Sequence, residues 1–232
     1  GSLINTFSCL RFDFNNDNKM WDILYVGRAV KFKKIPEFFN VIRALYDQGN
    51  MFRVLFICPI PTNVDSSVFD DIRDKYNDMF SGSERQLFNL LTLDYEYPFP
   101  FDIETLSHFY KSSRILVYTA DDERRPRTVA YAIASGMPTV LMDSVASLLP
   151  GDKRIKPIVY LADSYEQYPS LIVEALAFTR SDEYTKNSMI AGITEFNAES
   201  NLDRLGDKLF ELFQVNLHED NRINSILYNL DI

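Results

Sequence analysis

The sequence contains few of the residues that build disulfide frameworks and metal sites. Only two cysteines, Cys9 and Cys58, and two histidines, His108 and His218, occur in 232 residues. Two cysteines are too few for the disulfide framework of a small secreted domain. The four side chains show no repeated ligand spacing, so we expect no metal site. Cys58 ends an apolar run that begins at Val54, which indicates a buried free thiol.

Long apolar runs and glycine-rich phosphate motifs are also missing. No stretch approaches the roughly 20 apolar residues that a membrane span needs, and no secretory signal precedes the domain. We therefore expect a cytoplasmic protein without a membrane span. No Gly-x-Gly-x-x-Gly follows the first predicted strand and no Gly-Lys-Ser/Thr occurs, so dinucleotide-binding and P-loop assignments lack their fingerprints.

Negative charge predominates over positive charge. The chain has 33 Asp and Glu against 24 Lys and Arg, which gives a formal net charge of -9. An acidic surface repels nucleic-acid phosphates and anionic lipids, so we expect no nucleic-acid partner. A local basic cluster could still bind one phosphorylated ligand. The length and the 46% of hydrophobic residues favour one large domain with a sizeable core.

Short apolar runs alternate with helical patterns along the chain, which is typical of βαβ units. The six predicted strands cover residues 23–26, 53–57, 86–93, 115–119, 139–142 and 158–161. The predicted helices cover residues 36–46, 66–79, 102–111, 128–134, 165–180, 181–196 and 201–213. This pattern predicts an α/β fold with a doubly wound, parallel, Rossmann-like sheet of order 3-2-1-4-5-6. Ligands of such sheets bind beyond the carboxyl ends of the strands, near the switch point.

The predicted domain organisation is simple. We expect an N-terminal segment over residues 1–20, a Rossmann-like domain over 21–215 and a C-terminal tail over 216–232. The opening Gly1-Ser2 resembles a remnant of tag removal, so we expect the chain to be a piece of a longer protein.

The first candidate site follows the first predicted strand. Gly27 is followed by four cations within seven residues, namely Arg28, Lys31, Lys33 and Lys34. Glycine lets the backbone approach a ligand closely, arginine forks onto phosphate oxygens and lysine adds a point charge. The alternative interpretation is a solvated charged loop.

The second candidate site follows the fourth predicted strand and leads into a helix that starts at Thr128. A helix N-terminus beside a strand end suits an anion, and Glu123 could accept hydrogen bonds from sugar hydroxyls. The alternative is an ordinary charged loop whose acids and arginines pair with each other. The loop consists of Asp121, Asp122, Glu123, Arg124, Arg125, Pro126 and Arg127.

These segments together resemble GT-B enzymes of the glycosyltransferases group 1 family. Val26-Gly27-Arg28, with Lys33 six residues beyond Gly27, is similar to that family's Gly-Arg…Lys segment. Residues 106–118 resemble its helix-and-strand segment. Residues 123–140 resemble its Glu-x₇-Glu stretch, which continues as Glu-Ala-Met-Ala-x-Gly-x-Pro-Val. The similarity extends roughly over residues 22–177.

The resemblance implies a donor-binding C-terminal half that holds a nucleotide-diphosphate sugar. Arg28 and Lys33 would then bind the diphosphate beside the close backbone of Gly27 and the helix that begins at Thr128. Glu123 would lie by the donor sugar as the catalytic residue. Tyr131 stands where the family has a ribose-binding Glu, and a phenol cannot bind two hydroxyls as a carboxylate does.

The resemblance also implies a reaction and partners. Sugar transfer would proceed with retention to an acceptor glycan, lipid or protein. The donor is a substrate, so no cofactor is expected, and cations with a helix terminus would replace a metal. The residues before Trp21 are too few to form the acceptor-binding N-terminal half. We therefore expect an upstream half in the longer protein and little transfer by this chain alone.

Two other functions stay open from the sequence. The domain could be a non-catalytic nucleotide-sugar-binding or scaffolding domain, since Tyr131 replaces a carboxylate. An upstream Rossmann-like half in the longer protein would favour the enzyme. The second is an unrelated α/β enzyme with a phosphorylated substrate, which would need a nucleophile or base at a strand end. His108 instead lies within a predicted helix.

Overall fold

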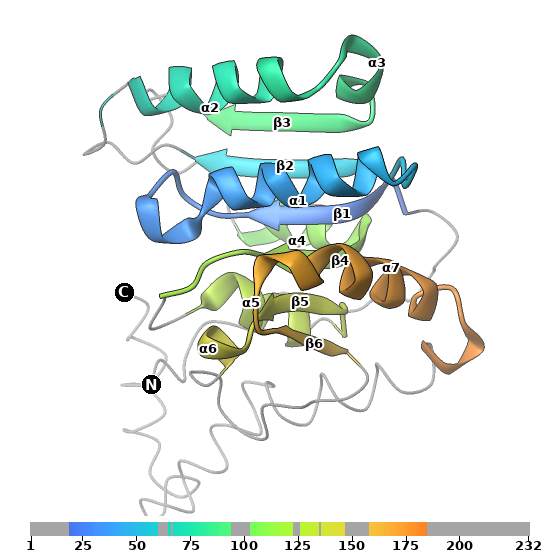
Figure 1. Ribbon diagram of the computed structural model, residues 1–232. Helices are drawn as coiled ribbons and strands as arrows, with labels where there is room; N and C mark the ends of the chain where they lie inside the picture. Colours follow the sequence, from blue (N-terminus) through green and yellow to red (C-terminus); the bar gives the residue numbers. More distant parts are fainter. Residues whose placement is uncertain are drawn as a thin grey trace, which may run out of the picture.

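A computed structural model describes residues 19–59, 65, 67–93, 103–122, 126–134, 136–146 and 158–184. They form a six-stranded sheet between two layers of helices (Figure 1). Every strand pairing is parallel, and the order is β3-β2-β1-β4-β5-β6. The predicted doubly wound sheet and its order are therefore confirmed. The strands are β1 (Trp21–Val26), β2 (Val54–Pro59), β3 (Phe88–Leu93), β4 (Ser113–Tyr118), β5 (Thr139–Met142) and β6 (Val159–Ala162).

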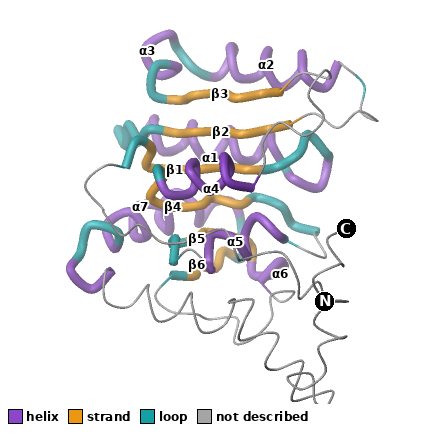
Figure 2. Tube along the Cα trace, turned by 180° about the vertical axis from the view of Figure 1, so that it is seen from behind, coloured by secondary structure: helices purple, strands orange, loops and turns teal. Residues whose placement is uncertain are grey.

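The helices divide between the two faces of this sheet. Helices α1, α2 and α7 cover one face, and α4 and α5 cover the other, which Figure 2 shows from behind. The α-helices are α1 (Ile35–Asp47), α2 (Ser67–Met79), α3 (Gly82–Arg85), α4 (Ile103–Lys111), α5 (Arg127–Ala134), α6 (Asp143–Ala146) and α7 (Tyr168–Phe178). Two 3-10 turns, η2 (Lys31–Lys33) and η3 (Tyr165–Gln167), precede α1 and α7. No helix in these ranges is long and apolar enough to cross a membrane.

The core lies on both faces of the sheet because successive strand residues point to opposite sides. In β1, Ile23 and Tyr25 pack under α1, whereas Leu24 and Val26 pack toward α4 and α5. All four side chains are buried. Burial on both faces explains why the strands appear in the sequence as continuous apolar runs rather than alternating ones.

An aromatic cluster under α1 fixes the carboxyl half of β1. Phe56 lies at its centre, and its ring stacks on Tyr25 with centroids 4.5 Å apart. The rings of Phe38 and Phe39 lie 5.4 Å and 5.3 Å from Phe56. Aromatic pairs at such distances add about 0.5–1.5 kcal/mol each beyond the burial of their area. The packing of Tyr25 therefore holds the end of β1, from which the loop to α1 begins, in a fixed position.

Most predicted boundaries agree with the structure to within a few residues. The third strand begins at Phe88 rather than at residue 86, because α3 ends at Arg85 and residues 86 and 87 form a turn after it. A capping box of Ser81 and Glu84 starts α3. The last described helix begins later than expected, with η3 before it and Pro169 in its first turn. Gly136 has a φ of 62°, as predicted for the residue that ends α5.

Several predictions concern residues outside the described ranges. They are the helix at 201–213, most of the helix at 181–196, the capping role of residue 102 and the domain boundary at 215. These stay predictions.

Candidate anion-binding site

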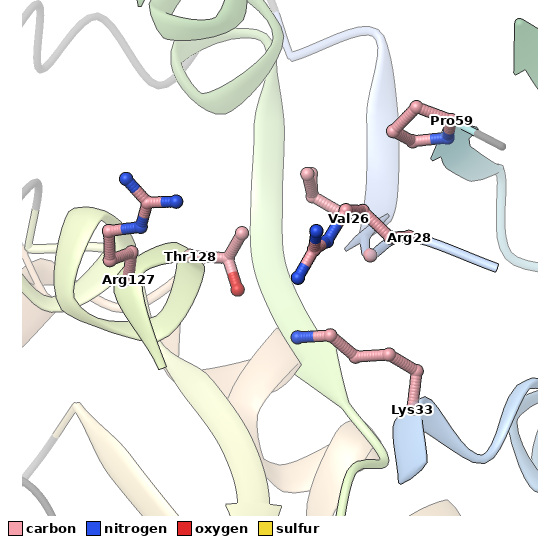
Figure 3. A pocket seen from close by; sticks show the side chains of 7 residues that line it. Val26, Arg28, Lys33, Pro59, Arg127 and Thr128 are labelled. Atoms are coloured by element: carbon pink, nitrogen blue, oxygen red, sulfur yellow. The ribbon is translucent and has the colours of Figure 1, made fainter. Parts of the chain in front are cut away.

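A small pocket lies where the sequence places the switch point of the sheet. Strands β1 and β4 pair in parallel, with Leu24 opposite Leu116, so their carboxyl ends meet at one edge. The pocket measures about 150 Å³ and opens beyond this edge (Figure 3). Its lining includes Gly27, Arg28, Lys33, Pro59, Arg127 and Thr128. Four of the six predicted site residues therefore lie together, although they are up to about a hundred positions apart in the sequence.

Two cationic side chains, Arg28 and Lys33, extend into this pocket from the loop that follows β1. In Figure 3 the guanidinium of Arg28 and the ammonium of Lys33 both extend toward the hydroxyl of Thr128. Arg127 extends away from the other two cations. The described lining contains no carboxylate. Such an arrangement attracts an anion of small size, such as a phosphate group.

Gly27 is needed here because the buried ring of Tyr25 lies against it. A Cβ atom at this position would lie 2.8 Å from the Tyr25 hydroxyl oxygen and 3.0 Å from Cζ. The Gly27 N–H also donates to the carbonyl of Ile57 at 3.0 Å. The absence of a side chain at Gly27 therefore lets the backbone lie against the ring of Tyr25, and this contact restricts the backbone at the pocket wall.

Lys33 is a buried lysine whose ammonium is held by aromatic side chains. Only 5% of its surface is exposed. Its Nζ donates to the Tyr118 hydroxyl oxygen at 2.6 Å. The same nitrogen lies 4.7 Å from the ring centroid of Tyr118 and 5.5 Å from that of Phe32, within the range of cation–π attraction.

Hydroxyl groups also fix the backbone of the loop between β1 and α1. The Lys33 carbonyl accepts from the Thr119 hydroxyl at 3.1 Å and from the Tyr25 hydroxyl at 3.3 Å. Thr119 also lies within hydrogen-bond distance of the Lys34 carbonyl, at 3.3 Å. The loop that carries the cations is thus fastened to the carboxyl end of β4.

Lys34 occupies an unusual backbone conformation directly after Lys33. Its φ of 51° lies in the left-handed region, which non-glycine residues rarely adopt. Its ammonium forms an ion pair with Asp121 at 2.9 Å. The hydrogen bond to Asp121 raises the pKa of Lys34 above its ordinary value. The charge of Lys34 is therefore paired with that of Asp121. Lys34 does not line the pocket.

The N-terminus of α5 forms the other wall of the pocket. The first N–H groups of a helix have no partner within the helix, and they carry partial positive charge. No acidic side chain lies in the first turn of α5. The Thr128 hydroxyl oxygen is buried and has no hydrogen-bond partner among the described residues. A phosphate oxygen in the pocket would satisfy it.

Two predicted site residues are not placed in the pocket. Glu123 lies outside the described residues, so its position near a donor sugar stays a prediction. Tyr131 is half-buried and does not line the pocket. Its ring packs edge-on against Tyr110, with centroids 6.4 Å apart. Its contact with a ribose also stays a prediction.

Sequence analysis missed the hydroxyl-bearing residues that surround Lys33. Tyr118 and Thr119 are the last two residues of the strand predicted over 115–119, and that prediction used only the apolar residues of the segment. Tyr165 and Tyr168 donate from the other side of the sheet to the carbonyls of Thr119 and Tyr118, at 3.0 Å and 2.8 Å. The available signal was a tyrosine inside a buried strand, because a buried phenol needs a hydrogen-bond partner.

Other features of the described chain were compared with this pocket. A larger cavity of about 600 Å³ lies between α1 and α2; its exposed surface is mostly apolar, and Lys31 and Lys34 of the first candidate segment are among its lining residues. No three His, Cys, Asp or Glu side chains in the described ranges gather as metal ligands. Burial raises the pKa of the Cys58 thiol to about 12, so this thiol is neutral and unreactive. His108 is exposed on α4.

Comparison with known proteins defines the class of fold. No family model and no curated protein matches the sequence. Among solved structures, a glycosyltransferase from Rickettsia africae matches with a TM-score of 0.60 and 10% identity, over 83% of this chain and 48% of that chain. The pneumococcal O-GlcNAc transferase GtfA, in complex with UDP and GlcNAc, matches with a TM-score of 0.55 and 16% identity, over 88% of this chain and 38% of that chain.

A third match indicates which part of such proteins the chain resembles. The C-terminal domain of a glycosyl transferase group 1 family protein from Francisella tularensis matches with a TM-score of 0.52 and 14% identity. The match covers 74% of this chain and 82% of that domain. The chain thus spans half or less of the first two proteins but most of an isolated C-terminal domain. These matches show that the chain has the Rossmann-like fold found in GT-B glycosyltransferases.

Proposed function

We propose that this domain binds the diphosphate of a nucleotide-sugar and acts as the donor half of a glycosyltransferase. One observation carries the proposal, namely that Arg28, Lys33 and Thr128 line a single pocket between β1 and β4. The pocket lies at the switch point, where doubly wound sheets bind nucleotides. The fold shared with glycosyltransferase structures supports the same function.

The chemistry follows from the charges of the pocket. When a sugar leaves its nucleotide, negative charge develops on the departing diphosphate. Arg28 and Lys33 would stabilise this charge, and so would the N-terminus of α5, because all three lie at the pocket where the diphosphate would bind. We infer that transfer is metal-independent for this reason. Retention, with Glu123 beside the donor sugar, is part of the proposal and rests on the sequence resemblance.

A direct binding experiment tests the donor site. Titration calorimetry with UDP, GDP and ADP, and with their sugar conjugates, would identify the donor nucleotide. Arg28→Ala should weaken binding of the preferred diphosphate about tenfold or more, because a hydrogen bond to a charged group contributes roughly 1.5–3 kcal/mol. Arg73→Ala is a matched control, since Arg73 is exposed on α2 and pairs with Asp70 at 2.8 Å. If Arg28→Ala binds the diphosphate as tightly as wild type does, the assignment is wrong.

A second candidate function is a non-catalytic domain that binds a nucleotide-sugar or supports a partner. It is favoured by Tyr131, which stands in the place of a carboxylate and packs on Tyr110. The test is a comparison of binding and turnover in the longer protein that includes any upstream half. Donor binding without transfer or donor hydrolysis would favour this candidate. Turnover that Glu123→Gln abolishes would favour the enzyme.

A further inference from the structure

The cavity between α1 and α2 has the size and the surface of a small-molecule site. Its volume of about 600 Å³ lies within the range of roughly 300–1,000 Å³ that is typical of ligand pockets. Its exposed surface is mostly apolar, and its described lining shares no residue with the anion pocket. We propose that this cavity binds an apolar chain that ends in a single anionic group, as in a medium-chain carboxylate. This inference goes beyond the proposed function and does not depend on it.

The cavity results from a change in side-chain size along two neighbouring helices, which lie side by side over one face of the sheet (Figure 1). Toward their carboxyl ends, aromatic rings fill the space between them. The ring of Phe80 lies 5.8 Å from that of Tyr46 and 6.1 Å from that of Phe39. Toward the amino ends, α2 contributes the smaller Val68 and Ile72 to the lining. The space that aromatic rings fill farther along the helices therefore stays open here.

The apolar walls of the cavity favour an apolar occupant. Ile35 and Phe39 line it from α1, and Val68 and Ile72 line it from α2. The latter two are four positions apart, so they lie on one face of their helix. Transfer of apolar surface from water to an apolar environment is favourable. An alkyl chain between these walls would therefore gain free energy from contact with both helices.

Two lysines at the cavity favour a negative head group. Lys31 belongs to η2 and is exposed, and Lys75 belongs to α2 and is half-buried. Neither ammonium has an ion-pair partner among the described residues. Asp71, one turn before Lys75, is exposed and lines the same cavity. These three side chains together carry one excess positive charge.

The other charged side chains of the described lining interact with protein groups. Lys34 pairs with Asp121 at 2.9 Å, and Glu37 accepts a hydrogen bond from the Asn40 amide at 3.1 Å. The hydrogen bond to Asp121 is the main cause that raises the pKa of Lys34, and the charge of Glu37 contributes to the same shift. One anionic group near Lys31 would therefore balance the remaining charge of the lining.

The first test measures binding of decanoate, below its micelle concentration, by titration calorimetry. Val68→Trp should weaken binding about tenfold or more, because the indole would occupy the space of the chain. Val173→Trp is the matched control, since Val173 is exposed on α7 and does not line the cavity. This control should bind decanoate within about twofold of wild type. Absence of decanoate binding to wild type, or equal loss in both variants, would overturn the inference.

The second test concerns the charge of the ligand and uses 1-decanol as a neutral probe with the same chain length. The double change of Lys31→Gln and Lys75→Gln should weaken decanoate about three- to tenfold, a range expected for two exposed ion pairs. The affinity for 1-decanol should stay within about twofold. An equal effect on the two probes would overturn the inference, because the lysines would then not recognise an anion. This test also decides the matter if Val68→Trp does not fold.

Inorganic pyrophosphate separates this inference from the proposed function. Decanoate should bind with the same affinity whether or not pyrophosphate is present, because the two sites have no described lining residue in common. Displacement of decanoate by pyrophosphate would show that decanoate occupies the anion pocket, and the inference would fail. If wild type binds decanoate but neither pyrophosphate nor a nucleoside diphosphate, the proposed function fails and this inference stands.

Discussion

Replacement of Gly27 by alanine tests whether the wall of the pocket is as tightly packed as its contacts indicate. The new Cβ would lie 2.8 Å, 3.0 Å and 3.1 Å from three atoms of the Tyr25 side chain. The ring of Tyr25 cannot move freely, because it stacks on Phe56 and lies 4.7 Å from the ring of Phe38. Its hydroxyl also donates to the Lys33 carbonyl.

The expected cost is that of overpacking a filled core. Extra methyl groups in such places destabilise proteins by about 1–3 kcal/mol. For a chain of this size, each kcal/mol lowers the Tm by roughly 2–4 °C. Gly82→Ala is the control, since a Cβ there meets nothing within 4 Å and the position begins α3. That variant should be as stable as wild type or slightly more stable, because alanine favours helix over glycine.

A double variant shows whether Tyr25 is the cause. Tyr25→Phe removes the hydroxyl oxygen, which makes the closest contact with the added methyl group. The Gly27→Ala change should therefore cost less in the Tyr25→Phe background than in wild type. Urea and thermal denaturation of the four proteins measure the difference. Wild-type stability of Gly27→Ala, or strictly additive effects, would refute the packing argument.

Two further predictions concern Lys34 and Glu84. Lys34→Gly should melt roughly 2–4 °C above Lys34→Ala, since both lose the Asp121 ion pair but only glycine relieves the left-handed backbone; equal melting temperatures would show that no strain exists. The Arg43 guanidinium, 2.7 Å away, lowers the pKa of Glu84 from 4.5 to about 2. The pair therefore stabilises the fold fully above pH 4.5, and this contribution is lost as pH falls toward 2. Urea denaturation at several pH values should show a smaller loss in Glu84→Gln than in wild type, whereas an unchanged pH profile would contradict the assignment.

The sheet could be predicted from the sequence because its strands are buried on both faces. Such strands appear as short apolar runs, and the helical patterns between them leave little choice of topology. Once the strand order is known, residues that follow β1 and β4 must meet at one edge. The juxtaposition of Arg28 with Thr128 is therefore a consequence of topology and does not depend on side-chain detail.

The environment of Lys33 could not be predicted in the same way. In the sequence it is one of several lysines in a short segment, and such segments are usually solvated. Tyr118 lies 85 residues away in the sequence. The contact between the two side chains depends on where η2, which ends at Lys33, lies relative to the end of β4. The left-handed backbone conformation of Lys34 could not be predicted from the sequence either, because lysine has no preference for that region.

The four cations that follow β1 have different surroundings in the structure. Lys31 is exposed, as a solvated loop requires, and Lys34 is paired with Asp121. Lys33 is buried under Tyr118, although burial of a lysine costs free energy unless its ammonium is held. The burial of Lys33 beside Arg28 supports the proposal that the pocket receives an anion.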